Sequence, residues 1–230
     1  MIGIICAMEI ELQKIKSSMK NIQTEEISSI NFHSGEFIGK DCVVAVSGVG
    51  KVNAAACAQT MILKYNPEFI INVGVAGGLL ENMQVYDIAI SKNAVQSDVD
   101  TSALGDPKGF ISTIEIINLP CSQDLASLIL NKKCEDRITI HYGTIASSDK
   151  FIADKKELQK IRENFDAIAC DMETASIAQV CYLNSTKFLS IRVISDNINN
   201  ENSHLDYEKF KKTAANKGFE IIKNLINEIK

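Results

Sequence analysis

Two apolar segments of this chain each give way abruptly to acidic residues, and this feature constrains the fold most. Residues 167–170 precede Asp171 and Glu173, and residues 187–194 precede Asp196. Buried carboxylates are costly unless they are paired or used chemically, and open α/β sheets build their binding sites at strand ends. We therefore predict two buried strands whose acidic ends share one pocket, with Glu173 in the first turn of a helix that begins near residue 172.

The rest of the chain alternates between strand and helix patterns. This alternation predicts a mostly parallel sheet covered on both faces, and consecutive strands after residue 27 make it mixed and strongly twisted, which disfavours a plain dinucleotide-binding fold. The polar segment 97–111 is expected to be a loop that forms one wall of a site. Strands are expected at residues 2–6, 27–37, 42–46, 69–73, 87–91 and 138–146, and helices after residue 9 and at residues 52–64, 155–164 and 207–229.

Composition limits the class of protein. A chain of 230 residues with 46% apolar content can close one large core, so residues 1–230 are expected to form a single domain. The formal charge of −5 offers no basic patch for a nucleic-acid polymer. No apolar run approaches the length that a bilayer needs, and no basic leader precedes the first strand. We expect no membrane contact.

Cysteine and histidine residues give no sign of a metal or a cofactor. The seven cysteines form no C-x-x-C pair, which fits reduced, buried thiols in a cytoplasmic protein. His33, His141 and His204 lack the spacing of metal ligands. No Gly-x-Ser-x-Gly turn and no paired cysteine nucleophile supports acyl transfer. Acid–base chemistry by carboxylates remains, without a metal or cofactor.

Two glycine-rich segments, 47–51 and 74–78, follow predicted strands. Glycine lets backbone amides converge on a bound group, but neither segment matches the dinucleotide or the phosphate-loop pattern. We interpret residues 74–78 as a close backbone approach to packing or to an uncharged part of a ligand.

Three acids at three predicted strand ends are the candidate catalytic set. Each of Glu11, Glu173 and Asp196 has a plain alternative explanation as a helix or turn cap. Three separate caps explain less well why all three acids fall at the same edge of one sheet. We therefore expect them to converge on one site.

The order of these motifs resembles a known family, the bacterial 5′-methylthioadenosine/S-adenosylhomocysteine nucleosidases of the purine nucleoside phosphorylase superfamily. The resemblance runs essentially from end to end of the chain. It is carried by residues 3–9 with Glu11, by residues 47–52 with Ala54 and Ala55, by residues 72–78, by Ser148, Asp149, Phe151 and Ile152, by Asp171, Met172 and Glu173, by Arg192 with residues 194–196, and by residues 203–205.

The resemblance implies a fold, an assembly and a pathway. The fold would be a three-layer α/β/α arrangement with a central mixed, partly barrel-like sheet. The protein would be a cytoplasmic homodimer that acts in methionine salvage on a small nucleoside, with the helix 52–64 and the loop 101–107 as candidate interface.

The resemblance also implies roles for individual residues. Asp196, held by Ser195, would be the general acid on N7 of adenine, and Glu11 would deprotonate the water that attacks C1′. Glu173 would hold the 2′ and 3′ hydroxyls of the ribose. The remaining expected substrate contacts are Met172 beside the sugar, Phe151 and Ile152 at adenine, Met8, Val49, Leu104 and Tyr207 at the thioalkyl tail, and Gly77 and Arg192.

Alternatives stay open at this stage. A phosphorylase of the same superfamily would hold phosphate with arginines, but the chain has only Arg137, Arg162 and Arg192, and Glu11 would repel the anion; Lys51 is the remaining candidate. A non-catalytic purine-binding protein would have no need of all three acids. Departures from the family pattern are Val75, Ser97, Asp171 and the loop 98–107, so 5′-deoxyadenosine or a futalosine-like nucleoside could also be the substrate.

Overall fold

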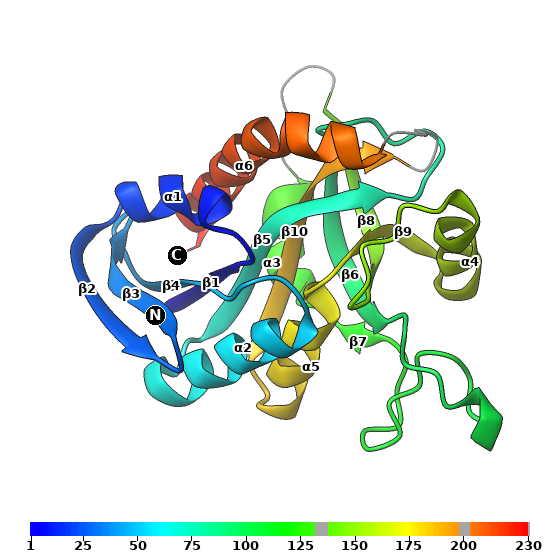
Figure 1. Ribbon diagram of the computed structural model, residues 1–230. Helices are drawn as coiled ribbons and strands as arrows, with labels where there is room; N and C mark the ends of the chain where they lie inside the picture. Colours follow the sequence, from blue (N-terminus) through cyan, green and yellow to red (C-terminus); the bar gives the residue numbers. More distant parts are fainter. Residues whose placement is uncertain (132–137, 198–202, 230) are drawn as a thin grey trace.

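A mixed β-sheet runs through the centre of the molecule and carries helices on both faces (Figure 1). The computed structural model describes residues 1–131, 138–197 and 203–229. In the last of these ranges, side chains are described only from residue 213 onward. The described strands are β1 (Ile2–Cys6), β2 (Lys20–Ile27), β3 (Ile30–Phe37), β4 (Lys40–Val46), β5 (Phe69–Gly78), β6 (Ile88–Gln96), β7 (Leu119–Pro120), β8 (Ile140–Ser147), β9 (Ala167–Asp171) and β10 (Lys187–Asn197). The described helices are α1 (Glu9–Ser17), α2 (Lys51–Tyr65), α3 (Gln123–Leu130), α4 (Lys155–Phe165), α5 (Thr174–Leu183) and α6 (Ser203–Glu228), with a short 3₁₀ turn, η1, at Ser102–Leu104.

Part of the sheet closes on itself. Strand β10 pairs in parallel with β5 and antiparallel with β6, β6 and β8 pair in parallel, and so do β8 and β9. The ring is completed where β9 meets β5 through Gly77 and Cys170. Four further strands extend from β5 in the order β1, β4, β3, β2, and the short strand β7 pairs with β6. The prediction of a mixed, partly barrel-like sheet is confirmed.

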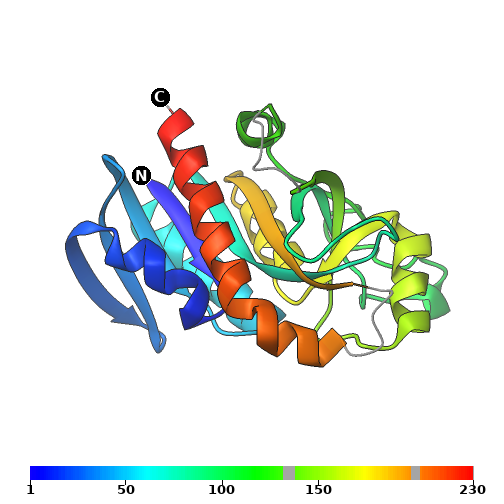
Figure 2. The same ribbon diagram turned by 90° about the horizontal axis from the view of Figure 1, so that it is seen from above.

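Alternating side chains of the strands bind the two helical layers to this sheet. In β1, Ile4 belongs to the apolar cluster under α1 and α6, whereas Ile5 belongs to the cluster under α2 and α5. Seen from above, α6 lies along β5 and β10 (Figure 2). Ala54 and Ala58 on α2 are fully buried, and their small side chains let this helix pack closely on the sheet. The three-layer prediction is confirmed.

Four elements differ from the sequence-based expectation. Strand β2 was not expected because its side chains are exposed or half-buried and mostly polar, so the chain shows no apolar alternation there. The short strand β7 and helix α3 were also not predicted. Strand β5 continues through residues 74–78, beyond its expected end at residue 73, because this stretch pairs with β10 along its length and with β9 at its end.

Candidate functional site

The carboxyl ends of β1, β5, β9 and β10 surround one pocket. The three candidate acids all line it, and so do seven of the other expected contacts. Its lining consists of Ala7, Met8, Glu11, Val49, Val75, Ala76, Gly77, Lys150, Phe151, Ile152, Cys170, Asp171, Met172, Glu173, Ser195 and Asp196.

Glu11 is fixed by the turn between β1 and α1. Its Oε2 accepts hydrogen bonds from the backbone amides of Ala7 and Met8, both at 3.0 Å, so it closes the first turn of α1 as a helix cap does. Its Oε1 accepts from the amide of Val75 at 3.2 Å. The side chain is only 3% exposed, and burial raises the pKa of the Glu11 carboxyl, while the charge of Arg192 opposes that rise.

Glu173 is the N-cap residue of α5 rather than a member of its first turn. Its Oε1 accepts a hydrogen bond from the amide of Gly50 at 3.0 Å, and its Oε2 lies 3.9 Å from Nη2 of Arg192. Burial, followed by the charge of Asp171, raises the pKa of Glu173 to about 7. The carboxyl therefore changes protonation near neutral pH.

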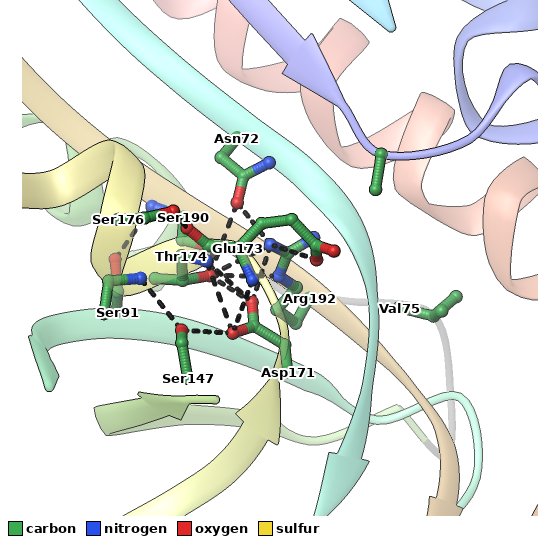
Figure 3. Close-up of polar contacts among 12 residues, drawn as sticks. Asn72, Val75, Ser91, Ser147, Asp171, Glu173, Thr174, Ser176, Ser190 and Arg192 are labelled. Atoms are coloured by element: carbon green, nitrogen blue, oxygen red, sulfur yellow. Dashed lines mark hydrogen bonds and ion pairs between the residues drawn. The ribbon is translucent and has the colours of Figure 1, made fainter. Parts of the chain in front are cut away.

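Arg192 lies behind the pocket wall, which corrects the expectation that it contacts the substrate. Its side chain is 1% exposed, and Nη2 forms an ion pair with Oδ2 of Asp171 at 2.6 Å. Nη2 also donates to Oδ1 of Asn72, and Nε and Nη2 donate to Oγ1 of Thr174 at 3.2 and 3.0 Å (Figure 3). Arg192 acts as a buried counter-charge for the carboxylates of the pocket.

Gly74 gives this guanidinium its space. A Cβ atom at position 74 would lie 2.1 Å from Nη1 of Arg192 and 2.8 Å from Oε1 of Glu11. The glycine is therefore required because cation and carboxylate approach the strand from its side-chain face, and not because the backbone turns there.

A bulge near the end of β10 sets the direction of Ser195 and Asp196. The register against β5 shifts between Ile194 and Asp196, which leaves Ser195 without a partner residue in that pairing. The hydroxyl of Ser195 donates to Oδ1 of Asp196 at 2.8 Å. A Cβ atom at Gly77 would lie 3.2 Å from Oδ2 of Asp196, so the glycine keeps this part of the pocket open.

The rim of the pocket is apolar and open. Phe151 is 46% exposed, and Val49 is about as exposed as Phe151. Leu104 is 84% exposed and does not line the pocket, because the loop between β6 and β7 projects away from the sheet (Figure 1). The expected contact at Tyr207 concerns a side chain outside the described residues, and the side chains of His204 and Arg137 also lie outside them.

Lys51 is already paired. Its Nζ forms an ion pair with Asp98 at 2.5 Å, and its backbone amide donates to Asp149 at 2.7 Å. The amide of Asp149 donates in turn to Asp98 at 2.9 Å. These contacts join the loop after β6 to the start of α2, so this lysine is engaged at the rim rather than directed at the pocket.

Three polar residues that hold Arg192 and Asp171 were missed from the sequence. Asn72 and Thr174 hold Arg192, and Ser147 donates a hydrogen bond to Oδ1 of Asp171. Asn72 is a polar residue in the middle of an apolar strand and Thr174 directly follows Glu173, so both positions carried a weak signal.

Neither a metal cluster nor a membrane-spanning helix occurs in the part of the chain that the structure describes. Among residues 1–131, 138–197 and the described part of α6, no three His, Cys, Asp or Glu side chains are placed to hold a metal ion. Over the same residues, no helix has the length and apolarity to span a bilayer.

The geometry suits cleavage of a bond between an electron-rich ring and a sugar. Asp196 lies against Gly77 of β5, whereas Glu11 lies against Gly74 of the same strand, together with Arg192, which is also 3.9 Å from Glu173. A proton donor at the leaving group and carboxylates near a developing positive charge both lower the barrier to such a cleavage.

Comparisons with known proteins agree with this chemistry. A family model described as the phosphorylase superfamily matches residues 1–227. The chain is 34% identical over 99% of both chains to the 5′-methylthioadenosine/S-adenosylhomocysteine nucleosidase of Bacillus subtilis. The structure superposes on the nucleosidase of Neisseria meningitidis in complex with methylthio-immucillin-A with a TM-score of 0.94, 29% identity and 99% coverage of both chains. It also superposes on futalosine hydrolase of Helicobacter pylori with a TM-score of 0.93 and 30% identity, covering 99% of this chain and 97% of the other.

Proposed function

The chain belongs to the phosphorylase superfamily and, within it, to the 5′-methylthioadenosine/S-adenosylhomocysteine nucleosidases, and we propose that it hydrolyses the N-glycosidic bond of these two nucleosides. The products are adenine and the corresponding thioribose. The observation that carries the proposal is the meeting of Glu11, Glu173 and Asp196 in one pocket.

Asp196 is the proposed general acid. Breaking the bond leaves negative charge on the base, and a proton delivered to N7 of adenine removes it. Ser195 holds the carboxyl in place through its 2.8 Å hydrogen bond. We call the part of the pocket around Ser195 and Asp196 the base side, where Phe151 stacks on adenine and the backbone of Ile152 bonds its edge.

Glu11 and Glu173 act on the opposite part, which we call the sugar side. Glu11 orients and deprotonates the attacking water, and the three backbone amides that bind it fix its direction. Glu173 accepts hydrogen bonds from the 2′ and 3′ hydroxyls of the ribose, with Met172 beside the ring. Carboxylates here stabilise the positive charge that develops on the sugar.

The charges of the pocket favour water over phosphate as the nucleophile. A phosphorylase must hold a dianion at the sugar, which calls for free cationic side chains. Arg192 is held by Asp171, Asn72 and Thr174, and Lys51 is paired with Asp98. Lys150, which lines the pocket, is paired with Glu157 at 2.6 Å. Glu11, whose carboxylate faces the place of the nucleophile, adds repulsion.

Residues 1–230 are proposed to act as one domain and to pair as a cytoplasmic homodimer in methionine salvage. Val52 and Leu63 lie eleven positions apart on α2, which places them on one helix face, and they are 77% and 75% exposed. Leu104 on the projecting loop is a third exposed apolar side chain. A partner over these residues would bring Leu104, with Met8, Val49 and Tyr207, to the thioalkyl end of the substrate.

Adenine release tests the proposal. We would incubate the protein with 5′-methylthioadenosine in phosphate-free buffer and again with added phosphate, and identify the sugar product. Free methylthioribose at the same rate in both buffers is the expected result. A sugar 1-phosphate that forms only with phosphate would make the protein a phosphorylase, and binding without turnover would make it a purine-binding protein.

Futalosine is the second substrate to assay, because one relative of known structure is a futalosine hydrolase. The open rim, with Val49 and Phe151 both about half exposed, leaves room for a larger 5′ substituent. The ratio of kcat/KM values for the two nucleosides decides between them.

A further inference from the structure

A buried polar network lies directly behind the sugar side, and its centre is Asp171. Its carboxylate forms the 2.6 Å ion pair with Arg192 and accepts hydrogen bonds from the hydroxyls of Ser147 and Thr174. The backbone amide of Thr174 also donates to both carboxylate oxygens, at 3.3 and 3.2 Å. The cation and these donors hold the buried carboxylate of Asp171 in one position.

Thr174 connects this carboxylate to the cation. Its Oγ1 accepts from Nε and Nη2 of Arg192 and donates to Oδ2 of Asp171 (Figure 3). Asn72 accepts from Nη2 on another side, and its own amide group is held by the carbonyl of Ile5 at 2.9 Å. The guanidinium is therefore fixed in one plane.

The cation is not shared equally among the carboxylates. Nη2 of Arg192 lies 2.6 Å from Asp171 but 3.9 Å from Glu173. Nη1 lies beneath Gly74, the same glycine that Glu11 approaches from the pocket. Because Asp171 neutralises part of the positive charge of Arg192, that part does not act on Glu173 and Glu11.

We propose that Asp171 is a positioning residue of the reaction: it holds Arg192 so that only part of this positive charge reaches Glu173 and Glu11. This rests on the proposed function, since it concerns how the sugar side meets the ribose. Asp171 thereby keeps Glu11 a stronger base and lets Glu173 change protonation near neutral pH. Without Asp171, the full charge of Arg192 would keep both acids ionised and make them weaker bases.

The groups that face Glu173 come from every element around it. They are Asp171 on β9, Arg192 on β10, Glu11 on α1 and the amide of Gly50 at the start of α2, with Asp196 lining the same pocket. Asp171 and Glu11 favour the protonated form of Glu173, whereas Arg192 and the amide favour the ionised form. Asp171 can be neutralised without altering a group that the proposed reaction uses directly, and without removing the cation itself.

Two variants separate charge from hydrogen bonding. Asp171→Asn removes the charge and keeps the size, so Glu173 should titrate at least one pH unit lower than in the parent protein. Thr174→Val removes the hydroxyl and keeps every charge, so the midpoint of Glu173 should stay in place while kcat falls severalfold. In Asp171→Asn, kcat should fall about tenfold because Glu11 becomes a weaker base. The KM at pH 6 should fall below that of the parent protein, because Glu173 stays ionised and binds the ribose hydroxyls.

The midpoint of Glu173 can be read without turnover, by ¹³C NMR of protein labelled at its glutamate carboxyls, with Glu173→Gln to assign the signal. Equal midpoints in Asp171→Asn and the parent, or an equal shift in Thr174→Val, would overturn the proposal. A parent midpoint near 4.5 would also overturn it, even if Asp171→Asn failed to fold. If the parent protein releases no adenine, the proposed function fails, and the NMR titration still decides whether Asp171 divides the charge.

Discussion

The sugar side and the base side of the pocket use carboxyl groups in different surroundings. On the sugar side, Glu11 and Glu173 are held by backbone amides at two helix starts, and a buried guanidinium lies behind them. On the base side, Asp196 follows a strand bulge and is bound by the hydroxyl of its neighbour Ser195. The first arrangement sets the charge around Glu11 and Glu173, and the second sets the orientation of the Asp196 carboxyl.

This difference fits the two tasks that we propose for these carboxyl groups. A carboxylate beside a positive sugar works through its charge, which neighbouring charges weaken or strengthen. A proton donor works only at hydrogen-bond distance from one ring nitrogen, so its direction matters most. We therefore expect substitutions on the sugar side to change pH dependence and stability, and those on the base side to change the rate alone.

Asp196→Asn is expected to have the largest effect. An amide cannot donate and recover a proton, so kcat should fall about 10³ to 10⁴-fold, at the upper end of what general acids contribute. Calorimetric titration with 5′-methylthioadenosine should give a Kd within about threefold of the parent KM. Undiminished turnover would remove Asp196 from the role of acid.

Glu11→Gln is expected to lower kcat about 10² to 10³-fold. The new amide group would also face one of the three backbone amides that now donate to Glu11, so its orientation is disturbed as well. Because burial raises the pKa of Glu11, kcat at saturating substrate should fall toward acid pH in the parent protein, and the part of this fall that comes from Glu11 should be lost in the variant. Adding formate to Glu11→Ala should restore part of the rate; no restoration would contradict a role as base.

Glu173→Gln should stabilise the protein while it impairs substrate binding. The pKa of Glu173 is about 7 in the folded protein against an ordinary value of 4.5 for a solvated glutamate, so the folded state holds a proton that the unfolded state has lost between these values. Stability therefore falls as pH rises from 4.5 to 7, by about 3 kcal/mol in total. Urea unfolding should show Glu173→Gln more stable than the parent at pH 8 and equal to it near pH 4.

A matched control for this measurement is Glu163→Gln, on the exposed side of α4. It should leave the free energy of unfolding unchanged at both pH values. If both variants gain stability alike at pH 8, the gain comes from the net charge of the protein and not from the sugar side.

The sequence indicated the three acids of the pocket more reliably than the buried Arg192 and its polar partners behind the pocket wall. Acids at strand ends predicted Glu11, Glu173 and Asp196, because parallel strands bring their carboxyl ends to one edge. The burial of Arg192 could not be predicted, since strand alternation does not say which face turns inward once a sheet closes into a ring. The glycine-rich segment 74–78 predicted a close approach to packing or to an uncharged part of a ligand, whereas the groups that approach Gly74 are the charged side chains of Arg192 and Glu11.

Gly74→Ala tests that close approach. Its Cβ would overlap Nη1 of Arg192 and crowd Oε1 of Glu11, so both charged groups must move. A displacement on the order of 1 Å in a catalytic group can cost about 10²-fold, and we expect kcat/KM to fall 10 to 100-fold. Gly78→Ala, in the same strand, would press mainly on the flexible side chain of Met83 and should leave kcat/KM within about twofold.

Ser195→Ala is expected to have the smallest effect and to separate direction from charge most cleanly. Removing the 2.8 Å hydrogen bond frees the carboxyl of Asp196 to rotate but leaves the acid present, so kcat should fall about tenfold, or about 1.4 kcal/mol in the barrier. Because Ser195 is proposed to act only through Asp196, the double variant with Asp196→Asn should be no slower than Asp196→Asn alone. Additive losses in this cycle would mean that the hydroxyl contacts the substrate itself, and the base side would then hold two catalytic groups instead of one acid and its support.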